Sequence, residues 1–242
     1  MPSTTPARLS RRTLLRGGLG AVTATALLPV GSVWASTAPT ATTRLLRRGT
    51  TGSDVRSLQR DLTGSGFWCG SADGIFGHLT QQAVWAVQKH HRLATDGVVG
   101  PLTRDAVGSW SLPQATGGAG SRVEIQLGSQ LLLVVRDGAT ALAFNTSTGN
   151  GEPYTLHGRT YRAITPTGSW KVYSTWSNGW QHGDLGDMWR PMYYDSGWAV
   201  HGSTSIPTYP ASHGCARVST AAMDYLWSSV AMAMGSRVTV TG

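Results

Sequence analysis

The chain has 242 residues, of which 20 are Lys or Arg, 12 are Asp or Glu and 7 are His, so its formal net charge is +8. This length accommodates one domain of ordinary size and a smaller one. The basic residues form no stripe with interleaved aromatic side chains, so the charge does not indicate a protein that binds nucleic acid.

The first 35 residues have the layout of an export signal. The basic stretch PARLSRRTLLRGG precedes an apolar stretch, LGAVTATALLPVG, and VWA ends at Ala35 as a small-residue cleavage site. The pair Arg11-Arg12 resembles a twin-arginine signal, which we favour over an ordinary secretory signal. The apolar stretch is too short and too rich in Thr and Pro to be a stable membrane anchor. We therefore expect an exported protein in the periplasm, the cell wall or the extracellular space.

Removal of residues 1–35 leaves 16 basic against 12 acidic residues, a mild excess that suits an anionic cell wall. Two low-complexity stretches then divide the exported part. Residues 36–44, which begin STAPTATT, are expected to be a flexible lead-in, and SWSLPQATGGAGS, residues 109–121, an interdomain linker. The sequence thus predicts a small domain over residues 45–108 and a larger one over residues 122–242.

Apolar residues of the small domain recur at helical spacing, which predicts a bundle of three short helices. Ser53 is expected to cap the first helix, and Pro101 to be the first residue of the third. The apolar positions of the first two helices are Val55, Leu58 and Leu62, and Ala83, Val84 and Val87.

The stretches LRRGTTGSDVRSLQRDL, ADGIFGHLTQQAVWAVQ and TDGVVGPLTRDAV resemble the peptidoglycan-binding domain of cell-wall enzymes. The segments DGIFGHLTQQAV and DGVVGPLTRDAV also align with each other without gaps, as two copies of a half-motif. Most of these positions are expected to be packing and turn residues. The resemblance implies that peptidoglycan is a partner of this domain.

The larger domain has the pattern of short strands. VEIQL, LLLVVRDG, GSWKVYSTW, GWAVHG and SRVTVTG are predicted strands, and Asp137-Gly138 is expected to form a hairpin turn. The stretch after Ser219, which is expected to be the cap, has helical spacing. The predicted fold class is therefore multidomain: a small three-helix bundle followed by a mostly-β sandwich or barrel-like domain with a late helix.

One of the two cysteines, Cys215, lies in ASHGCARVS between His213 and Arg217. A thiol attacks well only as a thiolate, which imidazoles, cations and backbone N–H groups favour. His201 lies at the end of a predicted strand and can lean over the loop that carries Cys215. The residues leave three interpretations open: a nucleophile, a metal ligand, or a disulfide with Cys69.

The run HGSTSIPTYPASHGCAR resembles the signature of the L,D-transpeptidase catalytic domain, the YkuD-like family. NTSTG and TPTGSWKV resemble further parts of that domain, so the resemblance spans residues 122–242. It implies that a cysteine thioester forms on the third residue of a peptidoglycan tetrapeptide stem and is resolved by the amine of a second stem, which gives a 3→3 cross-link. With water as acceptor the activity would be that of an L,D-carboxypeptidase. Carbapenem-type β-lactams are the covalent inhibitors that the resemblance implies.

The resemblance also implies roles for individual residues. Cys215 is the nucleophile, His201 the general base, and the carbonyl of Gly202 orients its imidazole. The amides of Gly214 and Cys215 are candidates for an oxyanion hole, and His213 for positioning the loop. The expected substrate-binding residues are Arg217, which could instead hold the loop, together with Tyr194, Gly197 and Ser212. No cofactor and no metal are expected.

Three alternatives remain beside this hypothesis. A Cys69–Cys215 disulfide would lock the domains together and consume the nucleophile, so Cys69 is expected to be a structural thiol. A zinc hydrolase would draw ligands from His182, Asp184, His201 and His213. A wall-binding protein with a decayed catalytic site is the third alternative.

Overall fold

A computed structural model describes residues 44–229 and 232–242. The expected export signal, residues 1–35, lies outside the described residues, as does the lead-in up to residue 43. The described residues all lie in one compact unit. Among the described residues, no helix has the length and apolar character needed to span a membrane.

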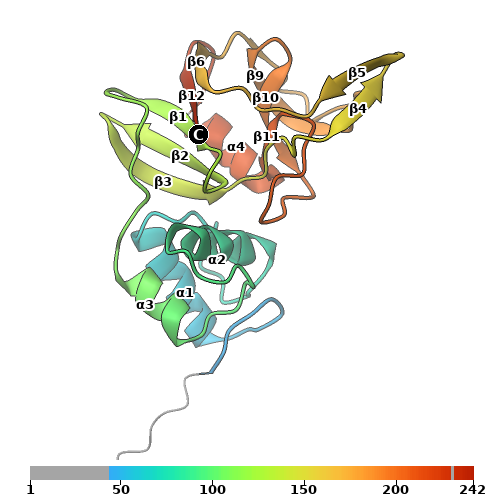
Figure 1. Cartoon of the computed structure of the whole chain (residues 1–242). Coiled ribbons are helices and arrows are strands. Elements are labelled where there is room, and N and C mark those ends of the chain that lie inside the picture. The colour runs from blue at the N-terminus through green and yellow to red at the C-terminus, as the bar shows by residue number, and fades with distance from the viewer. Residues whose placement is uncertain (1–43, 230–231) are drawn as a thin grey trace, which may run out of the picture. The chain divides into compact units, whose positions relative to one another are not determined.

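The chain begins with the three helices that its spacing predicts: α1 (Ser53–Gly64), α2 (His78–His90) and α3 (Pro101–Gly108) (Figure 1). Pro101 is the first residue of α3, as expected, because its missing N–H costs nothing there. The expected cap of α1 is wrong. The helix begins at Ser53 itself, and the capping position is Gly52, at φ 137°, with no side-chain hydrogen bond.

A buried glutamine on each of two helices fixes the turn that follows it. Gln59 donates from Nε2 to Asp73 Oδ1 at 2.8 Å and to Thr80 Oγ1 at 3.0 Å. Its Oε1 accepts the amide of Gly74 at 2.8 Å. Gln88 makes the equivalent bonds to Asp96, Thr103 and Gly97. The aligned half-motifs therefore reflect a repeated glutamine-to-turn arrangement.

The second part of the chain is mostly β and forms open, sandwich-like sheets. One sheet has the order β3-β2-β1-β12-β6, a second has the order β11-β10-β9-β7 with β8 on β9, and β4 pairs with β5 alone. Their bounds are β1 Arg122–Gln126, β2 Leu131–Arg136, β3 Ala139–Asn145, β4 Pro153–Leu156, β5 Arg159–Arg162, β6 Gly168–Lys171, β7 Ser174–Thr175, β8 Trp180–Gln181, β9 Met188–Asp195, β10 Trp198–Ser203, β11 Ala216–Ser219 and β12 Arg237–Thr241.

Two local expectations in this part are confirmed. Asp137 and Gly138 connect β2 to β3 with φ of 50° and 85°, the positive values that a two-residue hairpin requires. Ser219 caps α4 (Thr220–Ser228), since its Oγ accepts the amide of Ala222 at 3.1 Å. The late helix packs on β9, β10 and β11.

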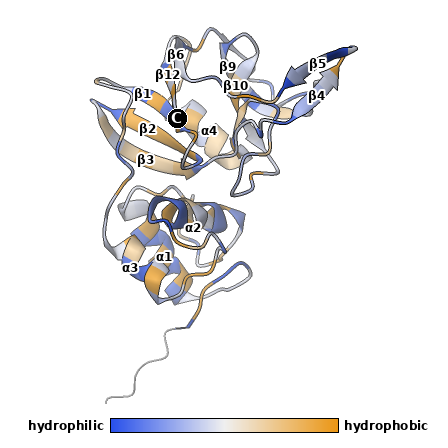
Figure 2. Cartoon of the chain, in the orientation of Figure 1, coloured by the Kyte–Doolittle hydropathy of each residue, from blue (hydrophilic) through white to orange (hydrophobic). Residues whose placement is uncertain are grey.

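Strand β2 is buried on both faces, and Figure 2 shows it as a run of hydrophobic residues. Its alternate residues Leu131, Leu133 and Val135 belong to the core that also contains the buried residues of α1, α2 and α3. Leu132 and Val134 point the other way, into the core of the two larger sheets. The helices and the first sheet therefore share a hydrophobic core.

A buried ion pair within β1 holds the stretch of chain that precedes this strand through hydrogen bonds. Arg122 and Glu124 form a salt bridge of 2.6 Å, and both side chains are fully buried. Glu124 also accepts the amides of Thr116 and Gly117, each at 2.8 Å. Burial alone would raise the pKa of Glu124, but these hydrogen bonds and those from Gln126 and Arg122 hold it below its ordinary value.

Candidate functional site

A groove of about 1140 Å³ contains both halves of the sequence signature. His201 comes from β10, and Cys215 lies directly before β11. These two strands are parallel neighbours, with Val200 opposite Ala216 and His201 opposite Arg217. Two segments 14 residues apart thus reach the same wall of the groove because their strands pair in this register.

The imidazole of His201 has a fixed orientation. Its Nδ1 lies 2.9 Å from the carbonyl oxygen of Gly202. Because a carbonyl only accepts, Nδ1 carries the proton and Nε2 keeps a lone pair. His201 is 4 % exposed. Burial lowers its pKa to about 4, the carbonyl of Gly202 opposes this, and the nearby Arg217 charge adds to it.

The thiol of Cys215 is half-buried and donates to the carbonyl of Gly197 at a sulfur–oxygen distance of 3.8 Å. Burial raises its pKa, while a hydrogen bond with the backbone of Ala199 and the charge of Arg217 oppose the increase. Both shifts favour the neutral forms, of the thiol and of the imidazole, in the unliganded groove. Desolvation opposes the thiolate that the charge of Arg217 favours, so a base is needed to take the thiol proton during the attack.

The loop that carries Cys215 is held by its own polar groups. Ser212 Oγ donates to the carbonyl of Cys215 at 2.6 Å and accepts the amide of Gly214 at 3.0 Å. Thr165 Oγ1 donates to the carbonyl of Gly214 at 2.6 Å. The hydroxyl of Ser212 is thus used inside the loop rather than offered to a substrate. The amide of Gly214 is likewise occupied, which leaves that of Cys215 as the candidate oxyanion donor.

Only glycine fits at position 214. Its φ is +141°, and a Cβ atom there would lie 2.6 Å from Trp198 Nε1 and 2.9 Å from the carbonyl of Ile164. The same indole nitrogen donates to that carbonyl at 2.8 Å. Trp198 therefore forms the wall against which the Cys215 loop is built.

The remaining predicted site residues lie at different depths. His213 is exposed at the groove, where its ring meets that of Tyr154 edge-on with centroids 4.9 Å apart. Gly197 and Arg217 also line the groove. Arg217 Nη1 donates to the carbonyl of Ala211 at 3.2 Å, so this guanidinium holds the loop and faces the groove at once.

Tyr194 does not line the groove. It is 2 % exposed and packs in the core against Trp170, with ring centroids 5.6 Å apart. Its neighbour Tyr193, on the opposite face of β9, lines the groove instead. The expected substrate-binding role of Tyr194 is therefore corrected by the alternation of the strand.

Sequence reasoning did not single out Tyr154, Thr165 or Trp198. Thr165 lies in the quoted stretch TPTGSWKV, so the motif contained a signal for it. Trp198 is one of ten tryptophans, and nothing in the sequence separates it from those that pack in the core.

The residues of the zinc alternative are not brought together. His182 pairs with Asp187 at 2.8 Å and His157 with Asp184 at 3.0 Å, both at exposed positions. Within residues 44–229 and 232–242, no group of three His, Cys, Asp or Glu side chains could hold a metal ion.

The two cysteines are free, with Cys69 buried in the helical part. Its Sγ lies 3.4 Å from the carbonyl oxygen of Gln59 and 3.4 Å from Thr63 Oγ1. Burial raises the pKa of Cys69, as expected for a structural thiol.

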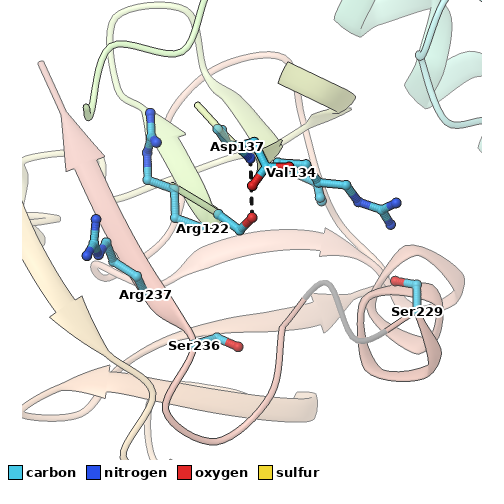
Figure 3. Close-up of a pocket in the computed structure, with 9 residues that line it drawn as sticks. Arg122, Val134, Asp137, Ser229, Ser236 and Arg237 are labelled. Atoms are coloured by element: carbon cyan, nitrogen blue, oxygen red, sulfur yellow. Dashed lines mark hydrogen bonds between the residues drawn. The ribbon is translucent and has the colours of Figure 1, made fainter. Parts of the chain in front are cut away.

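A second cavity, of about 350 Å³, lies at the β2–β3 hairpin and the start of β12 (Figure 3). Two of its arginines already bind partners within the protein. Arg122 binds Glu124, and Arg237 donates to the carbonyl of Ala119 at 3.3 Å. Asp137 at the rim adds a negative charge and donates its amide to Ser121 Oγ. No Cys or His lines this cavity, so the groove around Cys215 is the stronger candidate site.

Comparison with known proteins gives two family matches. Residues 51–107 match the model of a putative peptidoglycan-binding domain, and residues 120–240 match that of the L,D-transpeptidase catalytic domain, YkuD. The crystal structure of an L,D-transpeptidase from Xylanimonas cellulosilytica is 50 % identical with a TM-score of 0.78, and the match covers 82 % of this chain and 98 % of that one.

Matches to curated proteins are shorter. The chain is 42 % identical over 65 residues to the N-acetylmuramoyl-L-alanine amidase CwlL of Bacillus licheniformis, a match that covers 26 % of this chain and 18 % of that protein. It is 44 % identical over 52 residues to the amidase CwlM of Mycobacterium tuberculosis, covering 22 % of this chain and 13 % of that protein. The chain thus spans less than a fifth of either amidase.

The match to the Xylanimonas protein extends over nearly all of that chain, and the signature residues of the matched catalytic domain meet in one groove. The chain therefore belongs to the YkuD family of L,D-transpeptidase catalytic domains and carries a peptidoglycan-binding domain before the catalytic one.

Proposed function

We propose that this protein is a cysteine-dependent L,D-transpeptidase that forms 3→3 cross-links in peptidoglycan. The observation that carries the proposal is the pairing of β10 with β11, which places His201 and Cys215 in one groove. The neutral His201 presents Nε2 as a base, since Nδ1 is engaged by the carbonyl of Gly202. This is the arrangement that an inactive thiol needs in order to become a nucleophile.

In the first half-reaction, His201 Nε2 takes the proton of the Cys215 thiol while sulfur attacks the carbonyl carbon of the third stem residue. The amide of Cys215 stabilises the oxyanion of the tetrahedral intermediate. The intermediate collapses by breaking the C–N bond to the fourth residue, D-alanine. The imidazolium of His201 then protonates the leaving amine, and a thioester remains on Cys215.

In the second half-reaction, the side-chain amine of the third residue of another stem attacks the thioester carbonyl and gives its proton to His201. The C–S bond breaks, an amide bond forms, and the proton returns to the sulfur of Cys215. If water replaces the amine, the product is a tripeptide stem and the activity is that of an L,D-carboxypeptidase. This second activity uses the same thioester.

The groove offers features that suit a peptide stem bearing carboxylates. Arg217 and Arg162 contribute positive charge, and Tyr154, Tyr161 and Trp198 contribute aromatic surface. We further propose that residues 45–108 hold the protein on peptidoglycan and that residues 1–35 direct export by a twin-arginine type of signal. The cleaved protein would act in the cell wall or the periplasm.

The proposal is tested by intact mass spectrometry after incubation with a carbapenem. The wild type is expected to gain one adduct, Cys215→Ala none, and Cys69→Ala, the matched control, the same adduct as the wild type. A chelator should leave the reaction unchanged. Adduct formation that survives Cys215→Ala, or hydrolysis that a chelator abolishes, would contradict the cysteine mechanism.

The acceptor is identified by the products formed from a defined disaccharide tetrapeptide. Dimers joined between third residues are expected from transpeptidation, and tripeptide monomers from carboxypeptidation. Tripeptide monomers without dimers, in the presence of amine acceptor, would replace the transpeptidase proposal by the carboxypeptidase one.

A further inference from the structure

A polar cluster connects helix α2 with the catalytic part of the chain. It consists of Gln82 and Lys89 on α2 and Asn145 at the end of β3, and is called here the α2 cluster. Gln82 and Asn145 are 6 % and 3 % exposed. Buried amides of this kind are costly unless their hydrogen bonds are satisfied, so their partners indicate what the cluster holds in place.

The partner shared by both amides is the backbone of Ile206. Asn145 Nδ2 donates to Gln82 Oε1 at 2.7 Å and to the carbonyl of Ile206 at 3.2 Å. Gln82 Nε2 donates to the same carbonyl at 3.3 Å. Ile206 itself is 3 % exposed. One carbonyl of the segment after β10 is therefore gripped by two side chains, one of them from the helical part.

Lys89 completes the cluster from the next turns of α2. Its ammonium donates to the carbonyl of Gln130 at 2.9 Å, to that of Thr146 at 3.2 Å, and to Asn145 Oδ1. Burial lowers the pKa of Lys89 to about 7. All three acceptors of Lys89 are uncharged, and one of them is the side-chain oxygen of Asn145. The ammonium therefore fixes the orientation of the Asn145 amide rather than pairing with a carboxylate.

The segment held at Ile206 is part of the groove. Residues 204–211 connect β10, which carries His201 and ends at Ser203, to the loop of Cys215. Ser203, Thr204 and Ser205 line the groove directly before the gripped carbonyl. The far end of the segment is fixed within the catalytic part itself, because Ser147 Oγ donates to the carbonyl of Tyr209 at 2.7 Å.

We propose that Gln82 and Lys89 are positioning residues for the substrate groove: through Asn145 and the carbonyl of Ile206 they hold the wall formed by residues 203–205. The inference rests on the proposed function and adds to it that the helical part serves the reaction as well as the wall. Removal of the grip leaves His201 and Cys215 in place, since strand pairing holds them, but loosens one wall of the groove.

The test compares Gln82→Leu and Lys89→Met with Gln88→Leu in the full chain. Gln88 is the matched control because it is buried on the same helix and bonds only within the helical part. Steady-state kinetics use a soluble tetrapeptide stem. We expect KM for the stem to rise on the order of tenfold in the two cluster variants, with kcat changed less than threefold. Gln88→Leu should lower the stability yet keep both constants.

Alkylation of Cys215 by iodoacetamide, followed by peptide mass mapping, should proceed at the wild-type rate in all three variants. An unchanged KM in Gln82→Leu would overturn the inference. So would an equal rise in Gln88→Leu, because general destabilisation would then explain both. If the wild type itself neither forms the carbapenem adduct nor turns over the stem, the proposed function fails instead, and the two failures are distinguished.

Discussion

Replacement of Glu124 by Gln is expected to destabilise the protein by about 3–5 kcal/mol, the usual cost of removing one partner from a buried ion pair. Both side chains of the Arg122–Glu124 pair are fully buried. Thr116 and Gly117 donate to different oxygens of the carboxylate, so the one oxygen of a carboxamide can accept only one of these two amides. The guanidinium of Arg122 also stays buried without its counter-charge, so the loss is one of charge pairing and hydrogen bonding rather than of packing.

The double variant Arg122→Met, Glu124→Leu removes both charges and keeps most of the volume. Its stability is expected to lie above that of Glu124→Gln and about 2 kcal/mol below that of the wild type. Apolar side chains replace a buried ion pair at little cost, but the amides of Thr116 and Gly117 lose their acceptors, at about 1 kcal/mol each. Glu152→Gln is the control, because Glu152 is exposed and such surface changes stay within about 0.5 kcal/mol.

Urea unfolding at pH 7, followed by tryptophan fluorescence, measures the four free energies. The pKa of Glu124 is lower in the folded chain than in the unfolded one. Its ionisation therefore stabilises the fold above the ordinary pKa of 4.5, and this contribution is lost as the pH falls through the pKa of the folded state. The difference between the wild type and Glu124→Gln should shrink accordingly in acid. Equal destabilisation in the single and the double variant would refute the reasoning.

Three further predictions concern the site and the helices. Because burial lowers the pKa of His201 to about 4, the rate of acylation should fall to half near pH 4 and not near 6.5, the ordinary pKa of histidine. An acylation rate that halves near pH 6.5 would contradict this lowered pKa. Gly214→Ala should slow carbapenem acylation by at least about tenfold, because the new methyl group overlaps Trp198 and the carbonyl of Ile164. Gly151→Ala is the control, since its φ is also positive but nothing lies within 4 Å, and it should keep the wild-type rate. Equal acylation rates in the two variants would contradict the steric role of Gly214. Gln59→Leu should lower the free energy of unfolding by about 3–4 kcal/mol, about 1 kcal/mol for each of its four hydrogen bonds. Urea titration measures this loss against the exposed control Gln114→Leu. A loss no larger than that of the control would contradict the role of Gln59 in holding the turn.

The sequence was sufficient to identify the residues that local chemistry and pattern constrain. The turn at Asp137 and Gly138, the cap at Ser219 and the start of α3 at Pro101 follow from rules that act over a few residues. The meeting of His201 and Cys215 is different, because it depends on the register of two strands. The end of a predicted strand allows His201 to reach the loop of Cys215, and the two-part signature at its spacing implies that they act together.

Two features of the site were not predicted from the sequence: which face of strand β9 each tyrosine occupies, and how burial and nearby charge combine to set the pKa of Cys215. Alternation from Met192, which is buried, would have placed Tyr194 on the core face and Tyr193 on the groove face. The direction in which the pKa of Cys215 shifts depends on whether burial outweighs the charge of Arg217, and composition does not give that balance. The grip of Gln82 on Ile206 joins residues 124 positions apart and has no sequence signature.

The two-sided burial of β2 bears on how such proteins can be recombined. Its run LLLVV is apolar at every position because water reaches neither face. A gene fusion that replaced the helical part with an unrelated binding module would uncover Leu131, Leu133 and Val135 together, as an apolar patch on an otherwise folded enzyme. Such a fusion would need polar residues at these three positions, and a catalytic domain released by proteolysis would be prone to self-association.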